Sequence, residues 1–345
     1  MGVKRILLGM SGGVDSAAAA VLLLREGYDV EGATLLLEET AGAADAAKAA
    51  AALGIPHRTV ELRDVFRREV MDVFAAEYRA GRTPNPCVLC NRAVKFGAML
   101  RYALDNGFDG VATGHYARLT EKDGRTLLLA APTDKDQSYM LYALSQEQLS
   151  RANFPLGELT KEDARALARE AGLDAASKPE SQDICFVPDG DYAAFLGRYA
   201  GEPFTPGDFV DGDGNILGRH GGLARYTVGQ RKGLGSFGRP MYVTALDAAR
   251  NRVVVGPEGS QYSGGAIISS LNWIAFGAPL APFSCTVKLR YRAKPAACTV
   301  EPLGDGRVLA RFDEPQRAVT PGQSAVFYDG ALVLGGGVID RPAAP

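Results

Sequence analysis

Apolar and polar positions follow two different patterns along the chain, and the change falls near residue 203. In the first part, short apolar runs alternate with Ala- and Leu-rich stretches of helical periodicity. Strands that alternate with helices predict βαβ units and a parallel sheet. We expect strands at residues 5–10, 28–37, 57–62 and 110–113, and helices at residues 16–26, 43–53, 64–81, 91–106 and 160–171, the last with Thr160 and Asp163 as a capping box.

Beyond residue 203, glycine and proline become frequent, and turn signals separate short β-rich runs. We expect strands at residues 241–245, 252–255, 284–290, 307–312, 324–328 and 332–338. This texture is typical of small β-domains or barrels. A length of 345 residues is long for one core, so the predicted fold is an α/β domain with a parallel sheet, followed by β-domains.

The net charge says little about binding partners, and only two short basic stretches are informative. The net charge is −2, which does not by itself indicate a nucleic-acid binder. Residues 217–239 contain five Arg or Lys and no acid, and residues 286–298 contain four and no acid. By charge alone, these stretches are equally compatible with solvated faces. No apolar run has the length of a membrane span, and residues 1–10 read as a buried strand without a cleavage site, so we expect a cytoplasmic protein.

A glycine loop, Ser11-Gly12-Gly13-Val14-Asp15-Ser16, lies between a predicted strand and a predicted helix. Its glycines let the backbone approach an anion, and the helix start offers N–H groups and a positive dipole end. The alternative is a plain glycine turn with a serine cap. The full pattern in this context predicts a pyrophosphate cradle, and Asp15 beside phosphates implies Mg²⁺.

Five cysteines, at positions 87, 90, 185, 285 and 298, indicate chemistry rather than a disulfide framework, because their number is odd and no export signal precedes them. We expect Cys90 just before a helix start, where a thiol pKa falls. Cys185 lies in a second turn-like segment, and two loops that each present a thiol suit sulfur transfer. Taken singly, each cysteine is better explained as a small buried apolar residue, which is the commoner fate of a cysteine. For Cys285 and Cys298 we prefer that core interpretation.

The glycine loop resembles the signature of the PP-loop ATP pyrophosphatases, which cleave ATP between the α and β phosphates. Within them, the chain resembles the tRNA-specific 2-thiouridylases from one end to the other. The matching segments are residues 9–16, 80–96, 112–116 (A-T-G-H-Y), 135–139 (K-D-Q-S-Y), 177–187, 226–235 (Y-T-V-G-Q-R-K-G-L-G), 287–292 (V-K-L-R-Y-R) and 320–328 (T-P-G-Q-S-A-V-F-Y).

This resemblance implies three domains and a set of site residues. The domains are a PP-loop (adenine nucleotide alpha hydrolase-like) catalytic domain at residues 1–200, a central β-domain at 201–265 and a tRNA-contacting C-terminal β-barrel at 266–345. Cys90 matches the nucleophile, and Cys185 matches the cysteine that carries a persulfide. The implied ATP contacts are Gly9, Met10, Ser11, Gly12, Gly13, Val14, Asp15, Ser16, Leu35 and Gly114. The implied contacts with the target base are Asn85, Pro86 and Cys87, and those with tRNA are His115, Lys135, Asp136, Gln137, Arg290, Tyr291 and Gln323.

The reaction that the resemblance implies is ATP-dependent conversion of the wobble uridine (position 34) to 2-thiouridine. Its substrates are tRNAs of the Lys, Glu and Gln type, and sulfur comes from a persulfide donor such as a cysteine desulfurase or a sulfur-relay protein. Adenylation of the C2 oxygen precedes sulfur delivery from Cys185, and Cys90 attacks either the resulting linkage or the persulfide itself. If the basic residues contact tRNA, replacing Arg290 and Arg292 should flatten the salt dependence of binding.

The chain departs from the family pattern in two places. Cys87 stands where many members have an acidic residue, and residues 37–45 form a short segment without aromatic side chains, which weakens the assignment of Leu35. Three alternatives stay open: a PP-loop synthetase for a small metabolite, a nucleotide-binding module without catalysis, and an enzyme with an iron–sulfur cluster on Cys87, Cys90 and Cys185. We do not favour the cluster.

Overall fold

The computed structural model describes residues 3–38, 42–174, 184–201 and 204–343. In this part of the chain, the N-terminal region contains a five-stranded parallel sheet in the order β3-β2-β1-β4-β7. Its strands are β1 (Arg5–Gly9), β2 (Asp29–Leu36), β3 (His57–Glu61), β4 (Gly110–Ala112) and β7 (Ala152–Asn153). The chain runs outward from β1 to β3 and then returns to the other side of β1. This reversal makes the carboxyl ends of β1 and β4 the expected ligand site.

Both faces of the sheet are covered. Successive residues of β1 point to opposite sides of the sheet, so each face packs against a core of its own. Leu7 belongs to a core with Phe74 and Val94, whereas Leu8 belongs to a second core with Ala18 and Ala46. The helices are α1 (Val14–Arg25), α2 (Ala43–Ala52), α3 (Arg63–Phe66), α4 (Asp72–Arg79), α5 (Pro86–Cys90), α6 (Met99–Asp105), α7 (Gln146–Ser150), α8 (Lys161–Glu170) and α9 (Tyr192–Ala200).

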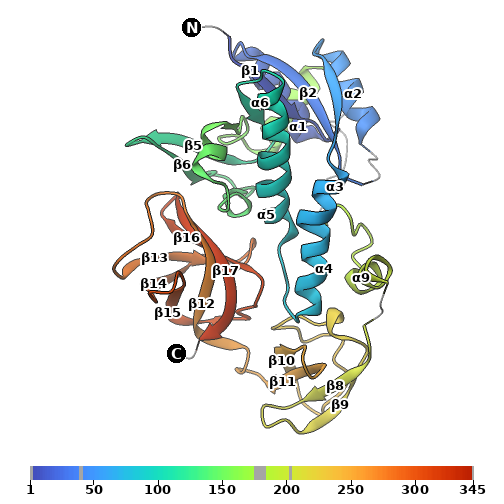
Figure 1. The fold of residues 1–345 in the computed structure, drawn as a ribbon, viewed down its shortest axis with the longest axis vertical. Coiled ribbons are helices and arrows are strands. Elements are labelled where there is room, and N and C mark those ends of the chain that lie inside the picture. Colours follow the sequence, from blue (N-terminus) through green and yellow to red (C-terminus); the bar gives the residue numbers. More distant parts are fainter. Residues whose placement is uncertain (1–2, 39–41, 175–183, 202–203, 344–345) are drawn as a thin grey trace.

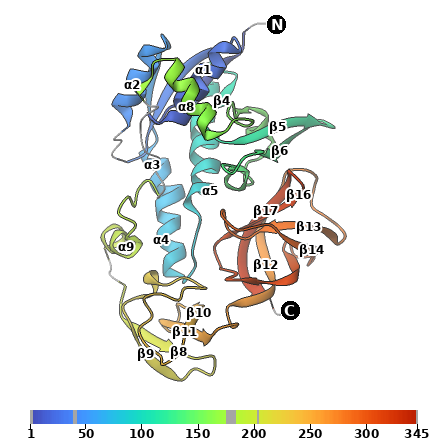
Figure 2. The ribbon, with the colours of Figure 1, turned by 180° about the vertical axis from the view of Figure 1, so that it is seen from behind.

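Two long helices extend from the sheet towards the rest of the molecule. A π-helical segment, Arg67–Met71, joins α3 to α4, and a second one, Asn91–Ala98, joins α5 to α6. Figures 1 and 2 both show the two helices side by side, with α4 ending against the smaller β-domain. Residues at the α5 end of the second helix therefore lie beneath the sheet and face the C-terminal domains.

Two further sheets follow, both built from the short β-rich runs. The smaller one has the order β10-β11-β8-β9, and six antiparallel strands close into a barrel in the order β12-β15-β14-β13-β16-β17, with β17 pairing back to β12. The bounds are β8 (Gly207–Val210), β9 (Ile216–His220), β10 (Met241–Asp247), β11 (Arg252–Pro257), β12 (Tyr262–Trp273), β13 (Phe283–Lys288), β14 (Ala296–Pro302), β15 (Val308–Arg317), β16 (Ser324–Asp329) and β17 (Leu332–Ala343).

The predicted fold class is confirmed, and so is the capping box of Thr160 and Asp163 at the start of α8. The predicted helix start at residue 91 is wrong: the helix begins at Pro86, where Asn85 accepts the N–H of Cys87 at 3.2 Å. The predicted start of the first helix was also late, since α1 begins at Val14. Sequence periodicity did not reveal the hairpin of β5 (Ala117–Lys122) and β6 (Arg125–Ala130), which pairs with β17 and so extends the barrel sheet.

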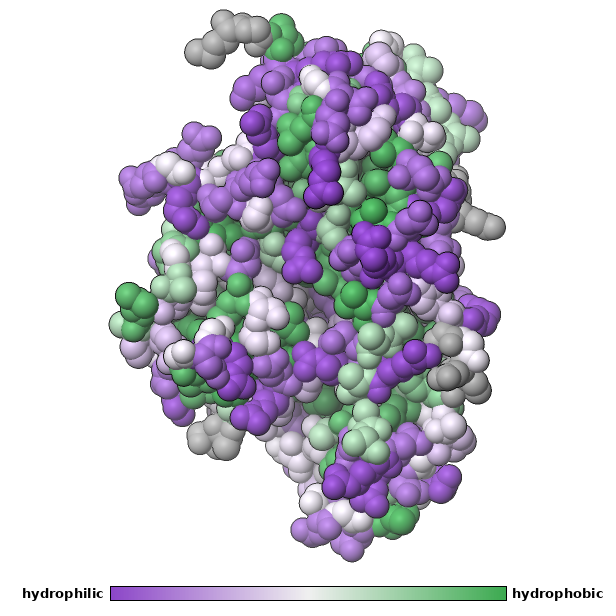
Figure 3. Space-filling model, viewed as in Figure 1, coloured by the Kyte–Doolittle hydropathy of each residue, from purple (hydrophilic) through white to green (hydrophobic). Residues whose placement is uncertain are grey.

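The surface in Figure 3 mixes hydrophilic and hydrophobic residues without a continuous apolar area on the face shown. In the part of the chain that the structure describes, no helix has the length and apolar character needed to cross a membrane.

Candidate functional site

The glycine loop lies at the carboxyl end of β1, as the strand order requires. Gly12 has φ of +76°, a conformation that a residue with a side chain rarely adopts. Ser16 closes the loop: its hydroxyl donates to the Gly13 carbonyl at 3.0 Å and accepts the Ser11 N–H at 3.3 Å. Ser16 therefore shapes the loop from inside the helix, and Ser11, which is exposed, is left to face a ligand.

Two distant segments press against this loop. A Cβ on Gly42 would lie 2.2 Å from the Ser11 carbonyl oxygen, and a Cβ on Gly114 would lie 2.8 Å from the backbone carbon of Asp15. Both positions need glycine because backbone approaches backbone. Sequence reasoning singled out Gly114 but missed Gly42, which follows a segment that carries no motif.

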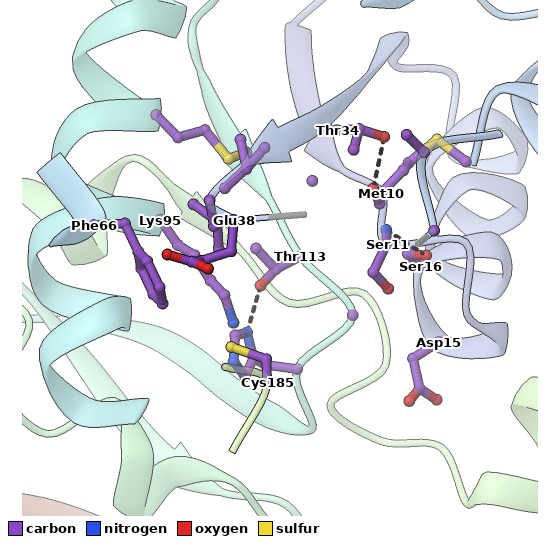
Figure 4. Close-up of a pocket in the computed structure, with 18 of the residues that line it drawn as sticks. Met10, Ser11, Asp15, Ser16, Thr34, Glu38, Phe66, Lys95, Thr113 and Cys185 are labelled. Carbon is purple, nitrogen blue, oxygen red and sulfur yellow. Dashed lines mark hydrogen bonds between the residues drawn. The ribbon is translucent and has the colours of Figure 1, made fainter. Parts of the chain in front are cut away.

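A cavity of about 680 Å³ opens beside the loop, a size suited to a nucleotide. Its described walls come from the glycine loop, the end of β2, the helix that contains Lys95, the turn after β4 and the segment with Cys185 (Figure 4). Of the predicted ATP contacts, the cavity is lined by Gly9, Met10, Ser11, Asp15, Ser16, Leu35 and Gly114. Gly12, Gly13 and Val14 belong to the same loop but not to the lining.

Asp15 has partners that its motif did not reveal. The amine of Lys161, at the start of α8, lies 2.8 Å from each of its carboxylate oxygens, and the Tyr116 hydroxyl donates to it at 2.7 Å. Lys161 is only 7% exposed, so the pair is well shielded on the lysine side. A lysine brought in from α8 thus balances the charge of Asp15 beside the phosphate loop.

Mg²⁺ fits this arrangement only together with a nucleotide. The described residues contain no group of three His, Cys, Asp or Glu side chains that could hold a metal. Mg²⁺ commonly takes one or two carboxylates and completes its shell with water and substrate phosphates. Asp15 could supply such a carboxylate if Lys161 gave up one of the two oxygens.

The prediction that Cys90 lies at a helix start is wrong. Cys90 lies at the C-terminal end of α5, where it is 8% exposed. Burial raises the pKa of its thiol to about 12, while the charge of Lys95 acts to lower it. The expectation of a thiolate favoured by a helix dipole is therefore wrong for Cys90. Cys87 occupies the first turn instead, and it is exposed.

Cys185 lines the cavity together with the glycine loop, from which it is distant in sequence. The residue is exposed, but its sulfur turns into the cavity, where desolvation raises the pKa of the thiol and Lys95 lowers it. Cys185 and Cys90 are both free thiols, and the Cys185 thiol acts to raise the pKa of Cys90. The part of the predicted motif at residues 177–183 lies outside the described residues.

The donor set for an iron–sulfur cluster does not fit. Cys87, Cys90 and Cys185 are all described, yet they are not grouped closely enough to form a three-ligand metal site. We derive no step through a cluster.

The predicted tRNA contacts near the cavity hold the turn after β4. Gln137 accepts the N–H of Tyr116 at 3.0 Å and lines the cavity, as does His115. His115 bonds to the Thr113 hydroxyl at 2.7 Å, and burial, followed by the charge of Lys95, holds its pKa well below the usual value, so it is neutral at neutral pH. Asp136 accepts the N–H groups of Ala131 and Ser138. Lys135 is half-buried.

The predicted contacts from the barrel lie where it meets the other domains. Arg290 donates to the carbonyls of Val228 and Ala318 and to the Thr320 hydroxyl, at 3.1, 3.2 and 2.5 Å. Gln323 donates to the Thr83 carbonyl at 2.8 Å, next to Pro84, Asn85 and Pro86. The Tyr291 ring is 6.1 Å from that of Tyr139. Arg290 thus joins the barrel to the segment that contains Val228, and Gln323 joins it to the segment that leads into α5.

We therefore expect Arg290 and Arg292 to differ. Arg290→Ala removes three hydrogen bonds, although the Ala318 carbonyl still accepts from the Thr320 hydroxyl, and should lower the free energy of unfolding by about 1–3 kcal/mol. Arg292 is exposed, so Arg292→Ala should leave stability unchanged and reduce the log–log slope of tRNA affinity against salt by about 0.7–0.9. Thermal melts and binding titrations at several salt concentrations test this. An unchanged slope for Arg292→Ala would show that this side chain does not contact phosphate.

The strand, glycine loop, helix and nucleotide-sized cavity define a PP-loop protein with two β-domains. Family models match residues 4–189 (tRNA methyl transferase HUP domain), 193–257 (tRNA methyl transferase PRC-barrel domain) and 263–339 (Aminomethyltransferase beta-barrel domain). The tRNA-specific 2-thiouridylase MnmA of Acetivibrio thermocellus is 49% identical, over 98% of this chain and 100% of the relative. That of Carboxydothermus hydrogenoformans is 47% identical, over 99% of each chain. The chain belongs to the tRNA-specific 2-thiouridylases, a family of enzymes.

Solved structures are more distant. The crystal structure of a predicted subunit of tRNA methyltransferase from Methanocaldococcus jannaschii is 20% identical, with a TM-score of 0.34 over 58% of this chain and 90% of that one.

Proposed function

We propose that the chain is a tRNA-uridine 2-sulfurtransferase that converts the wobble uridine at position 34 into 2-thiouridine, with AMP and pyrophosphate as the other products. The observation that carries the proposal is the cavity that joins the phosphate loop to Cys185, which lies close enough to Cys90 to act on the pKa of the Cys90 thiol. Family membership supports the same substrate class.

In the first step, the C2 oxygen of uridine attacks the α phosphate of ATP, and pyrophosphate leaves. The residues proposed to act here are Ser11 and the backbone of the glycine loop, which would donate to the phosphates, and Gly114, which lets the turn after β4 approach Asp15. Mg²⁺, when bound, would add further neutralisation of phosphate charge near Asp15. Adenylation is needed because the uracil oxygen is otherwise a poor leaving group.

In the second step, the terminal sulfur of a Cys185 persulfide attacks C2, and AMP leaves with the oxygen. Cys90 then attacks the Cys185 sulfur, so that the bond between the two sulfurs breaks. Thiouridine departs, and a Cys90–Cys185 disulfide remains, to be reduced before the next turnover. In the alternative order, Cys90 first attacks Cys185 of the persulfide and releases hydrosulfide, which then attacks C2. The upstream donor would be a persulfide-bearing protein, and the base must leave its stack to reach the cavity. A cytoplasmic location stays a prediction.

The direct test is product analysis with the full chain. Unmodified tRNAs for Lys, Glu and Gln are incubated with the protein, ATP, Mg²⁺ and a sulfide or persulfide donor, and the nucleosides are identified by mass spectrometry. We expect 2-thiouridine at position 34 and an equal amount of AMP. Two rivals predict otherwise: a small-metabolite synthetase would release pyrophosphate without tRNA, and a noncatalytic binding module would release none.

A further inference from the structure

The cavity contains one cation that no sequence motif revealed. Among the described residues that line it, Lys95 is the only Lys or Arg, and the other charged ones are Asp15 and Glu38. Asp15 is already paired with Lys161, and His115 is neutral at neutral pH. No ion pair joins Lys95 to any described carboxylate. Figure 4 shows its side chain directed towards Cys185.

Backbone geometry explains how Lys95 reaches this position. Cys90 caps the π-helical segment Asn91–Ala98, in which hydrogen bonds join residues five apart. In an α-helix, residues three and four apart share a face, and a residue five apart turns away. The π-helical segment brings position 95 round towards the face of Cys90 and the cavity. Such segments are often found at functional sites.

We propose that Lys95 is the positioning cation of the sulfur-transfer step: its ammonium group faces the cavity that holds Cys185, lies on the helix that carries Cys90, and stabilises the sulfur anions that pass between them. The proposal rests on the function proposed above. A thiolate or persulfide anion in a desolvated cavity needs a nearby positive charge, and the described walls offer no second one.

Other groups also face Cys185. Cys87 of α5 acts on its charge, and three further groups line the same cavity: His115 of the turn after β4, Glu38 beyond β2 and Asp15 of the glycine loop. None of them supplies positive charge at neutral pH, and the two carboxylates act against a sulfur anion. Removing the charge of Lys95 should therefore raise the pKa of the Cys185 thiol, in agreement with the lowering effect that Lys95 has on all three neighbouring thiols.

The test measures the alkylation of Cys185 as a function of pH without tRNA or ATP. Iodoacetamide is uncharged, so Lys95 does not attract it, and peptide mass spectrometry separates Cys185 from the other cysteines. We expect Lys95→Met to slow the reaction at pH 8 about five- to tenfold and to move the profile to higher pH, because each unit of pKa reduces the thiolate about tenfold. Lys95→Arg should restore most of the rate. Arg101→Met, an exposed cation on α6 of the same long helix, is the matched control.

Identical pH profiles for the wild type and Lys95→Met would overturn the proposal. If the profile were unchanged and pyrophosphate release were lost as well, Lys95 would be assigned to the nucleotide phosphates instead. If Lys95→Met does not fold, Lys95→Gln provides the same comparison. The alkylation profile needs no tRNA, so it can support the role of Lys95 even if the substrate assignment fails.

Discussion

Replacing Cys185 or Cys90 with serine is expected to abolish 2-thiouridine formation, with a loss of at least about 10³-fold. A serine at 185 cannot carry a persulfide, and a serine at 90 cannot break the sulfur linkage, since its hydroxyl stays protonated. Pyrophosphate release should persist in part in both variants, because adenylation uses neither thiol. Nucleosides from tRNA treated with each variant, ATP and a persulfide donor are quantified by mass spectrometry.

Cys87→Ser is the matched control, because Cys87 is one turn before Cys90 on the same helix and is exposed, whereas Cys90 is buried. We expect it to retain most activity. Full thiolation by Cys185→Ser with a persulfide donor would rule out the carrier role. Loss of activity in Cys87→Ser equal to that of the other two variants would show that three thiols act together, contrary to our assignment.

The glycine loop could be predicted from sequence because its determinants are local. Gly12, Ser16 and the helix start lie within a few residues of one another, and the hydrogen bonds of Ser16 close the loop from within it. The partners of Asp15 could not be predicted in the same way. Lys161 is 146 residues away, and only the packing of α8 against α1 brings it to the loop. The capping box of α8 predicted a helix start there, but it did not indicate which other segment that helix start would contact.

The environment of the cysteines was predicted incorrectly for a different reason. The sequence pattern predicted a helix start just after Cys90, but proline is well tolerated in the first turn of a helix, and Asn85 caps the helix that begins at Pro86. Because the helix begins five residues earlier than predicted, Cys90 lies inside the long helix, and burial of its side chain raises the pKa of its thiol. The π-helical segment that follows has no sequence signature, so Lys95 could not be assigned.

The sequence predicted residues at the domain junctions as tRNA contacts, but it did not reveal their hydrogen bonds to other parts of the chain. Arg290 and Gln323 belong to segments that resemble tRNA-contacting ones, yet each donates to backbone carbonyls of another part of the chain. A sequence pattern cannot separate a contact with RNA from a contact with a neighbouring domain when both use the same donor groups. The hairpin of β5 and β6 was missed for a related reason, since its pairing with β17 spans some two hundred residues.

Asp15→Ala is expected to lower tRNA- and ATP-dependent pyrophosphate release by about 10²–10³-fold, the usual effect of removing one charge-stabilising group. The substitution also leaves Lys161 without its carboxylate in a shielded position. Because the Asp15 side chain is 35% exposed, we expect a moderate fall in the free energy of unfolding, about 1–3 kcal/mol. Thermal melts are therefore measured beside the kinetics.

Asp15→Asn separates the two roles of this carboxylate. Asparagine keeps an oxygen that can accept from Tyr116 and Lys161, so most of the stability should return. It carries no charge and is a weak ligand for Mg²⁺, so pyrophosphate release should stay low and need more Mg²⁺ for half-maximal rate. Lys161→Met completes the set, since it removes the ammonium group from both oxygens of Asp15 and leaves only the hydrogen bond from Tyr116. Normal pyrophosphate release with an unchanged Mg²⁺ requirement in a folded Asp15→Asn variant would exclude the metal role and leave Asp15 as the anchor of Lys161.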